Sequence, residues 1–166
     1  MSGDAGMNVV VTGGAGFIGG HLCRRLLERG DAVWAVDNFD PFYDPALKRE
    51  TVAELSAFPA FRLVEVDMCD PDATRAALAA AGGERMDAIV HLAARAGVRP
   101  SIQQPLAYAR VNVEGTAAVL ELSRRMGNVP VVFGSSSSVY GNSAPVPFRE
   151  DDPVAEPISP YAATKR

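Results

Sequence analysis

Short apolar stretches alternate with amphipathic stretches of helical spacing along most of the chain. Residues 9–11 and 32–36 form continuous apolar runs, which predict strands at 8–12 and 32–37, the first of them buried on both faces. Residues 17–29 carry apolar side chains at helical spacing and are followed by a glycine, which predicts a helix with a glycine cap. The same alternation continues to residue 133. Further strands are predicted at 61–66, 86–92 and 129–133, and further helices at 45–57, 70–81 and 106–126.

This alternation indicates the fold class. No hairpin turn joins two predicted strands, so each strand is expected to be linked to the next by a helical crossover, in a parallel sheet. We therefore predict a doubly wound, Rossmann-like α/β domain. In the helix at 45–57, Leu47, Val52 and Leu55 are expected to face the core. Residues 141–160, rich in proline and acidic side chains, are expected to form a long surface loop.

The composition is that of a globular protein without a basic surface. The chain has 166 residues, of which 48% are hydrophobic and 22% charged, and its net charge is −4. This charge argues against a nucleic-acid partner, and the apolar stretches are too short to span a membrane. Residues 1–7 lack the features of a secretory signal, and Cys23 and Cys69 have no paired spacing. We expect a reduced, cytoplasmic protein with no metal site, because His21 and His91 form no ligand cluster with the cysteines.

The first predicted strand leads into a glycine-rich turn at the start of the first helix. Gly13, Gly16 and Gly19 are three residues apart in the sequence TGGAGFIG at 12–19. Gly13 permits a backbone conformation that a Cβ disfavours, Gly16 permits close approach of a pyrophosphate, and Gly19 permits close packing of the helix on the sheet. N–H groups at the helix N-terminus would face the phosphates, so the turn predicts a dinucleotide site. A turn that serves packing alone is the alternative.

Asp37 ends the second predicted strand, at the position where dinucleotide-binding folds carry an acidic residue. A carboxylate there accepts hydrogen bonds from the adenosine ribose. It also repels the 2′-phosphate of NADP, and Asn38 and Phe39 follow it rather than an arginine. The pattern therefore predicts NAD as the cofactor.

Tyr161 and Lys165 are four residues apart, which places them on one face of a helix. A free tyrosine has a pKa of about 10, and a nearby ammonium group favours its phenolate, so the pair could supply a general base. A solvated helix face is the alternative for this common spacing. Serines at 135–138 follow the last predicted strand, at the edge of the sheet where ligands bind, and could contact a substrate alcohol. A turn whose serines satisfy its own backbone is the alternative there.

With these motifs the chain resembles the extended short-chain dehydrogenase/reductase family, in its nucleotide-sugar epimerase/dehydratase branch. The resemblance runs from about residue 7 to the end and includes the glycine turn, the HLAA stretch at 91–94 and the Y-x-x-x-K motif. Two further stretches, DNFDPFYDPALKR at 37–49 and AGVR at 96–99, make the chain most similar to UDP-glucuronate 4-epimerases.

The resemblance implies roles for the matching residues. Ser136 and Ser138 would contact the reacting sugar hydroxyl, Tyr161 would be the base, and Lys165 would bind the nicotinamide ribose. Asn112 would brace the interior near the active site. The implied substrate residues are Arg99, with a sugar carboxylate as its partner, Ser136 and Ser137. The implied cofactor-binding residues are Gly13, Gly16, Phe17, Ile18, Gly19, Asp37, Asn38, Asp67, Met68, Leu92, Ala93, Ala94, Asn112, Tyr161 and Lys165.

The implied reaction is epimerisation of a UDP-sugar, with UDP-glucuronate as the first candidate, by transient oxidation and reduction at C4 with NAD. Family members continue beyond the Y-x-x-x-K helix with further strands and a C-terminal substrate domain. Residues 1–166 are therefore expected to be a truncated NAD-binding domain that is inactive alone, and the full-length parent could be a homodimer.

Two other functions remain open. A dehydratase or decarboxylase of the same fold would have Asp-Glu, or Glu, before the VYG sequence at 139–141, where this chain has Ser137 and Ser138. These serines do not supply the acid and base that elimination needs, which favours an epimerase. The other alternative is a NAD-binding module without turnover.

Overall fold

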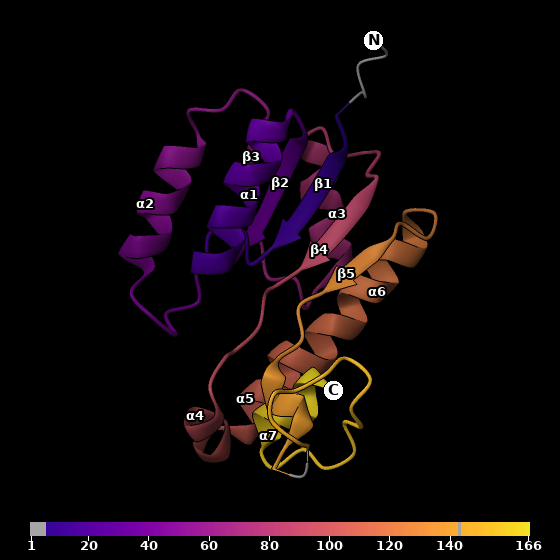
Figure 1. Ribbon diagram of the computed structural model, residues 1–166. Coiled ribbons are helices and arrows are strands. Elements are labelled where there is room, and N and C mark those ends of the chain that lie inside the picture. Colours follow the sequence, from indigo (N-terminus) through magenta and orange to yellow (C-terminus); the bar gives the residue numbers. More distant parts are fainter. Residues whose placement is uncertain (1–5, 143) are drawn as a thin grey trace.

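The strands of the protein are β1 (Asn8–Thr12), β2 (Ala32–Asp37), β3 (Phe61–Glu65), β4 (Ala88–His91) and β5 (Val131–Phe133). They form one parallel sheet in the order β3-β2-β1-β4-β5 (Figure 1). The structure is a computed structural model and describes residues 6–142 and 144–166. The chain winds outward from β1 to β3 and returns to β4 on the other side of β1, so the winding direction reverses between β1 and β4. The predicted doubly wound α/β fold is confirmed.

Helices cover both faces of the sheet (Figure 1). The helices of one face are α1 (Phe17–Arg29) and α2 (Pro45–Leu55), and those of the other are α3 (Pro71–Ala80) and α6 (Gly115–Arg125). Successive side chains of a strand enter opposite cores, since Val9 and Val11 belong to the core under α1, whereas Val10 belongs to the core with Leu78 and Leu122. This double burial explains the continuous apolar strands of the sequence. None of the helices in the described ranges combines the length and apolar character needed to cross a membrane.

The remaining helical segments lie beyond the carboxyl ends of the strands (Figure 1). They are α4 (Val98–Gln103), α5 (Pro105–Tyr108), the π-helical turn η1 (Ala109–Glu114), the 3₁₀ turn η2 (Ser137–Tyr140) and α7 (Pro160–Lys165). The single helix predicted at 106–126 is thus divided into α5, η1 and α6. Helix α4 has no counterpart in the prediction, because six residues that include a proline are too few to show an apolar period.

The predicted bounds of β1, α1 and β2 agree with the structure, whereas β4 and β5 each begin two residues later than predicted. Met86 and Val129 are buried in the core without joining the strand ladder, which explains the apolar signal before each strand. The prediction for Leu47 is wrong, since this side chain is 55% exposed and the neighbouring Lys48 is 8% exposed. The first turn of α2 borders the carboxyl edge of the sheet, where a paired cation is buried instead of an apolar group.

The turn between β1 and α1 depends on close backbone packing. Gly13 has a φ of +71°, a left-handed conformation, and its N–H donates to the Val36 carbonyl at 2.8 Å. A Cβ on Gly19 would overlap the carbonyl oxygen of Gly13. The prediction that Gly19 allows close packing on the sheet therefore needs correction, because its contact is with the turn itself.

His91 joins β1, β4 and α6 through buried hydrogen bonds. Its Nδ1 lies 2.7 Å from Thr12 Oγ1, and its Nε2 lies 3.0 Å from Thr116 Oγ1. The Thr116 hydroxyl donates to the Asn112 carbonyl, so it accepts from His91 Nε2, and the Thr12 hydroxyl donates to Nδ1. This network requires a neutral ring. Burial, with a smaller contribution from the charge of Lys165, lowers the pKa of His91 to about 4.

Gly19→Ala should destabilise the fold by about 1–3 kcal/mol, because the added Cβ must displace the Gly13 carbonyl. A loss of stability would be informative, since alanine within a helix is normally more favourable than glycine by about 1 kcal/mol. Urea unfolding followed by circular dichroism measures the change. Gly16→Ala is the control: its Cβ would lie 3.1 Å from Gly13 O and from the Tyr43 hydroxyl, so the loss should be smaller. A Gly19→Ala protein as stable as the unmodified chain would contradict this account of the turn.

Acidification should destabilise the fold through His91. In the unfolded chain His91 binds a proton below a pH of about 6.5, whereas the buried ring of the folded protein binds one only below about pH 4. The free energy of unfolding therefore falls as the pH falls through this window. Between about pH 7 and pH 5 the contribution is roughly 2 kcal/mol. His91→Gln, which cannot titrate, should flatten the dependence, whereas the same change at the exposed His21 should not. Urea unfolding at both pH values compares the three proteins, and an unchanged slope in His91→Gln would exclude His91 as the source.

Candidate functional site

A groove of about 400 Å³ lies at the carboxyl ends of β1, β2 and β4, where the winding of the sheet reverses. The glycine turn, the loop after β2, the segment after β4 and α7 form its walls. Of the residues predicted from the sequence, the groove is lined by Gly13, Gly16, Phe17, Ile18, Gly19, Asp37, Asn38, Asp67, Met68, Leu92, Ala93, Ala94, Tyr161 and Lys165. The structure thus brings together residues from both ends of the sequence.

The N-terminus of α1 borders this groove without a side-chain cap. Helices α2, α3 and α7 are capped by Asp44, Asp70 and Ser159, whereas the cap position of α1 is Gly16, whose missing side chain leaves the first N–H groups uncapped. Residues 16–19 line the groove, so these donors and the positive end of the helix dipole are directed at it. The arrangement fits the pyrophosphate of a dinucleotide.

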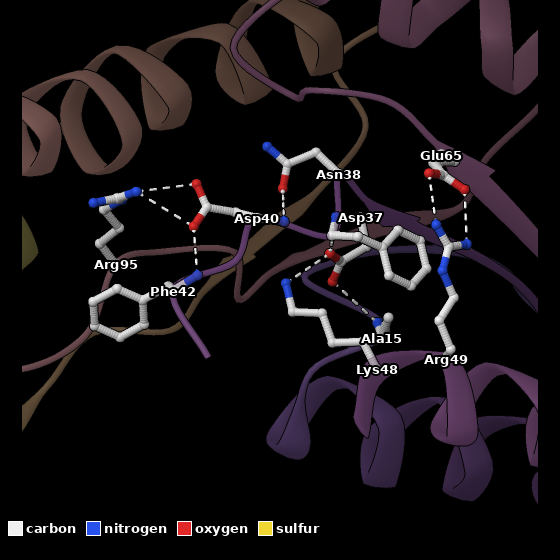
Figure 2. Close-up of polar contacts among 10 residues, drawn as sticks. Ala15, Asp37, Asn38, Asp40, Phe42, Lys48, Arg49, Glu65 and Arg95 are labelled. Carbon is white, nitrogen blue, oxygen red and sulfur yellow. Dashed lines mark hydrogen bonds and ion pairs between the residues drawn. The ribbon is translucent and has the colours of Figure 1, made fainter. Parts of the chain in front are cut away.

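Asp37, at the end of β2, is buried in the wall of the groove. Its Oδ2 accepts a hydrogen bond from Ala15 N at 3.3 Å, and its Oδ1 accepts from Phe39 N at 2.9 Å and from Lys48 Nζ at 3.0 Å (Figure 2). A carboxylate has about four acceptor positions, so Oδ2 retains one for a ribose hydroxyl. The residue can therefore take the role that the sequence predicts while it is paired with Lys48.

Arg95 connects the segment after β4 to the loop after β2. Its Nη2 lies 3.1 Å and 3.3 Å from the two carboxylate oxygens of Asp40, and its guanidinium lies 5.7 Å from the centre of the Phe42 ring (Figure 2). The carboxylate of Asp40 also accepts from Phe42 N at 2.9 Å, which fixes the loop conformation. Because all three residues line the groove, this contact forms one of its walls.

Helix α7 carries Tyr161 and Lys165 into the same groove. The Tyr161 N–H donates to Ser101 Oγ of α4 at 3.1 Å, which positions the first turn of α7. Lys165 is 4% exposed, and its ammonium donates to the Gly134 carbonyl at 2.6 Å. Burial lowers the pKa of Lys165 from its usual value. The four-residue spacing places both side chains at one end of the groove.

The serine-rich turn lies beside the groove, and only Ser135 is among the lining residues that the structure describes. Its hydroxyl donates to the carbonyl of Lys165 at 2.7 Å. Ser136 Oγ accepts from Ser138 N at 3.2 Å as the cap of η2, and Ser137 is exposed. The structure therefore places the predicted Ser136, Ser137 and Ser138 outside the groove wall, with Ser136 engaged by the backbone.

Asn112 and Arg99 also lie outside the groove. Asn112 Oδ1 accepts from Arg95 N at 2.8 Å, and its Nδ2 donates to Arg95 O and Thr164 Oγ1, each at 3.0 Å. Asn112 thus braces the segment after β4 against α7. Arg99 is exposed on α4. In the part of the chain that the structure describes, no three His, Cys, Asp or Glu side chains are grouped as a metal site.

Sequence reasoning misses Lys48, Asp40 and Arg95, which line the groove and carry its ion pairs. The signal for Lys48 is its position in the first turn of the helix after Asp37, since that turn begins at the carboxyl edge of the sheet. The Asp40–Arg95 pair joins residues 55 positions apart, and the sequence holds no comparable signal for it.

Comparisons with known proteins agree with this geometry. UDP-glucuronate 4-epimerase 4 of Arabidopsis thaliana is 41% identical over 162 residues, which cover 97% of this chain and 36% of that protein. UDP-glucuronate 4-epimerase of Thermodesulfobacterium geofontis is 41% identical over 157 residues, covering 95% and 47%. The crystal structure of a Bacillus cereus UDP-glucuronic acid 4-epimerase with NAD and a fluorinated UDP-glucuronic acid has a TM-score of 0.80 at 30% identity, covering 96% and 49%.

The chain spans less than half the length of these relatives. The matches extend over 95–97% of this chain at 30–41% identity. NAD, the predicted cofactor, is also the cofactor in the description of the matching family. Since residues 9–166 match that family, the chain belongs to the NAD dependent epimerase/dehydratase family.

Proposed function

We propose that this chain is the NAD-binding part of a nucleotide-sugar 4-epimerase whose substrate is UDP-glucuronate. The observation that carries the proposal is the presence of Tyr161 and Lys165 in the same groove as the glycine turn and Asp37. A base at one end of a dinucleotide groove is positioned to act on a substrate carbon beside the nicotinamide. The names of the relatives support UDP-glucuronate as the substrate.

In the proposed mechanism Tyr161 accepts the proton of the C4 hydroxyl and later returns it. Bound NAD would supply a reversible hydride acceptor for C4. Lys165 would hold the nicotinamide ribose, with its ammonium already fixed by the Gly134 carbonyl. Once the keto sugar has turned over in the site, Tyr161 would return the proton to the C4 oxygen, and hydride added to the opposite face of the C4 carbon would invert that centre. Proton and hydride balance over the cycle, so the cofactor is not consumed.

The charges of the groove support epimerisation over elimination or decarboxylation. The acidic residues that line the described groove are Asp37 at the end of β2, Asp40 in the loop after it and Asp67 after β3, whereas Lys165 of α7 bonds Gly134 beyond β5. Asp37 and Asp40 are occupied by cations, and Asp67 accepts from Cys69 N. The described groove therefore supplies no uncommitted carboxylate to act with Tyr161 in acid–base elimination.

A chimera tests the proposed reaction. Residues 1–166 joined to the second half of the Thermodesulfobacterium geofontis relative should interconvert the C4 epimers of UDP-glucuronate, while residues 1–166 alone should show no measurable turnover. Orientation and exclusion of water supply much of an enzyme's rate, and both would come from the second half. In the chimera, Tyr161→Phe should abolish turnover and leave NAD binding intact, because only the proton acceptor is removed. Chromatography of the sugar nucleotides separates the epimers.

The products distinguish the alternatives. A 4-keto or decarboxylated sugar from the chimera would refute the epimerase assignment. Rapid turnover by residues 1–166 alone would refute the requirement for a second half. Full activity of the Tyr161→Phe chimera would remove Tyr161 from its proposed role.

A further inference from the structure

Lys48 occupies an unusual place for a lysine. Its side chain is 9% exposed, it lines the groove, and its ammonium lies 3.0 Å from Asp37 Oδ1 (Figure 2). The ammonium also lies 5.2 Å from the centre of the Tyr43 ring. A buried ammonium is stable only when it is paired or well hydrogen-bonded, and Asp37 is the anion that pairs with Lys48 here.

The hydrogen bonds of Asp37 use only one of the N–H donors of Lys48. Phe39 N and Lys48 fill the two acceptor positions of Oδ1, and Ala15 N takes one of Oδ2. An ammonium group has three N–H donors, and Asp37 accepts one of them. The groove therefore holds, next to the carboxylate that would bind the adenosine ribose, a cation whose charge that carboxylate neutralises.

The other cations that line the described groove are committed elsewhere. Arg95 is paired with Asp40. Lys165 donates to Gly134 O after β5, a strand that lies on the opposite side of β1 from β2. On α2 itself, Arg49 follows Lys48 directly but its guanidinium pairs with Glu65 at 2.9 Å (Figure 2). Lys48 is thus the cation that a change at Asp37 would release.

We propose that Lys48 is a specificity-determining residue for the cofactor: a latent binding group for a ribose 2′-phosphate, kept occupied by Asp37. Asp37 then favours NAD in two ways, by repelling a 2′-phosphate and by neutralising the ammonium that would bind it. This inference rests on the proposed position of the adenosine ribose beside Asp37.

Binding of adenosine nucleotides isolates this end of the groove. Isothermal calorimetry would compare adenosine 5′-monophosphate with adenosine 2′,5′-bisphosphate, and NAD with NADP, on the 166-residue chain. In Asp37→Asn the affinity ratio should shift toward the 2′-phosphorylated ligand by about tenfold to hundredfold, as expected for one charge-assisted hydrogen bond. Adding Lys48→Met to Asp37→Asn should reverse most of that change in the affinity ratio.

A matched control separates the ammonium from general positive charge. Asp37→Asn with Arg49→Gln removes the neighbouring cation of the same helix and should keep the whole shift, as should Asp37→Asn with Lys48→Arg. Circular dichroism would verify that each variant folds, and Lys48→Gln replaces Lys48→Met if the latter does not fold.

The outcomes are distinct. Absence of a shift in Asp37→Asn, or a shift that removal of the lysine ammonium leaves undiminished, overturns the role of Lys48 and leaves the proposed epimerase unaffected. Failure of the unmodified chain to bind either NAD or adenosine 5′-monophosphate overturns the assignment of the groove and, with it, this inference. A shift that requires Lys48 but not Arg49 supports it.

Discussion

The candidate site depends on one buried carboxylate. The side chain of Asp37 is 4% exposed, and its oxygens accept hydrogen bonds from Ala15, Phe39 and Lys48, which belong to the glycine turn, the loop after β2 and helix α2. A buried carboxylate is costly unless its acceptor positions are filled, so the three segments can move apart only by exposing an unsatisfied charge. Asp37 thereby fixes the wall of the groove beside which the proposed adenosine ribose would lie.

The pairing of Asp37 with Lys48 is better explained by site geometry than by stability. Replacing a buried ion pair by well-packed apolar residues is often neutral or favourable, so such a pair is weak evidence for a stabilising role. The exposed pair of Arg49 and Glu65 contributes little for another reason, namely solvent screening. Arg49 instead contributes a packing contact, since its guanidinium lies 3.5 Å from the centre of the ring of Phe39, two residues after Asp37 in the loop that follows β2. Both cations of α2 therefore order the loop after β2.

The parts of the structure that follow from the sequence are those determined by neighbouring residues. The bounds of β1, α1 and β2 can be predicted because double burial, a glycine cap and helical spacing act within a few residues. The glycine turn, Asp37 and the Tyr161/Lys165 pair can be placed at one groove, because the carboxyl ends of parallel strands share an edge. The exposure of Leu47 and the burial of Lys48 cannot be predicted, since they depend on where α2 meets that edge.

Arg95 links the part of the groove that holds Tyr161 and Lys165 to the part that holds Asp37. Asn112 lies in the π-helical turn η1, and such turns locally change which side chains face inward. There Asn112 bonds both the backbone of Arg95 and Thr164 of α7, while the Arg95 side chain reaches Asp40 in the loop after β2. Arg95 thus connects Asn112, which also bonds α7, to the loop after β2. The proposed epimerisation would need its base and its cofactor in one fixed geometry through both oxidation and reduction, and these contacts supply that connection within this chain.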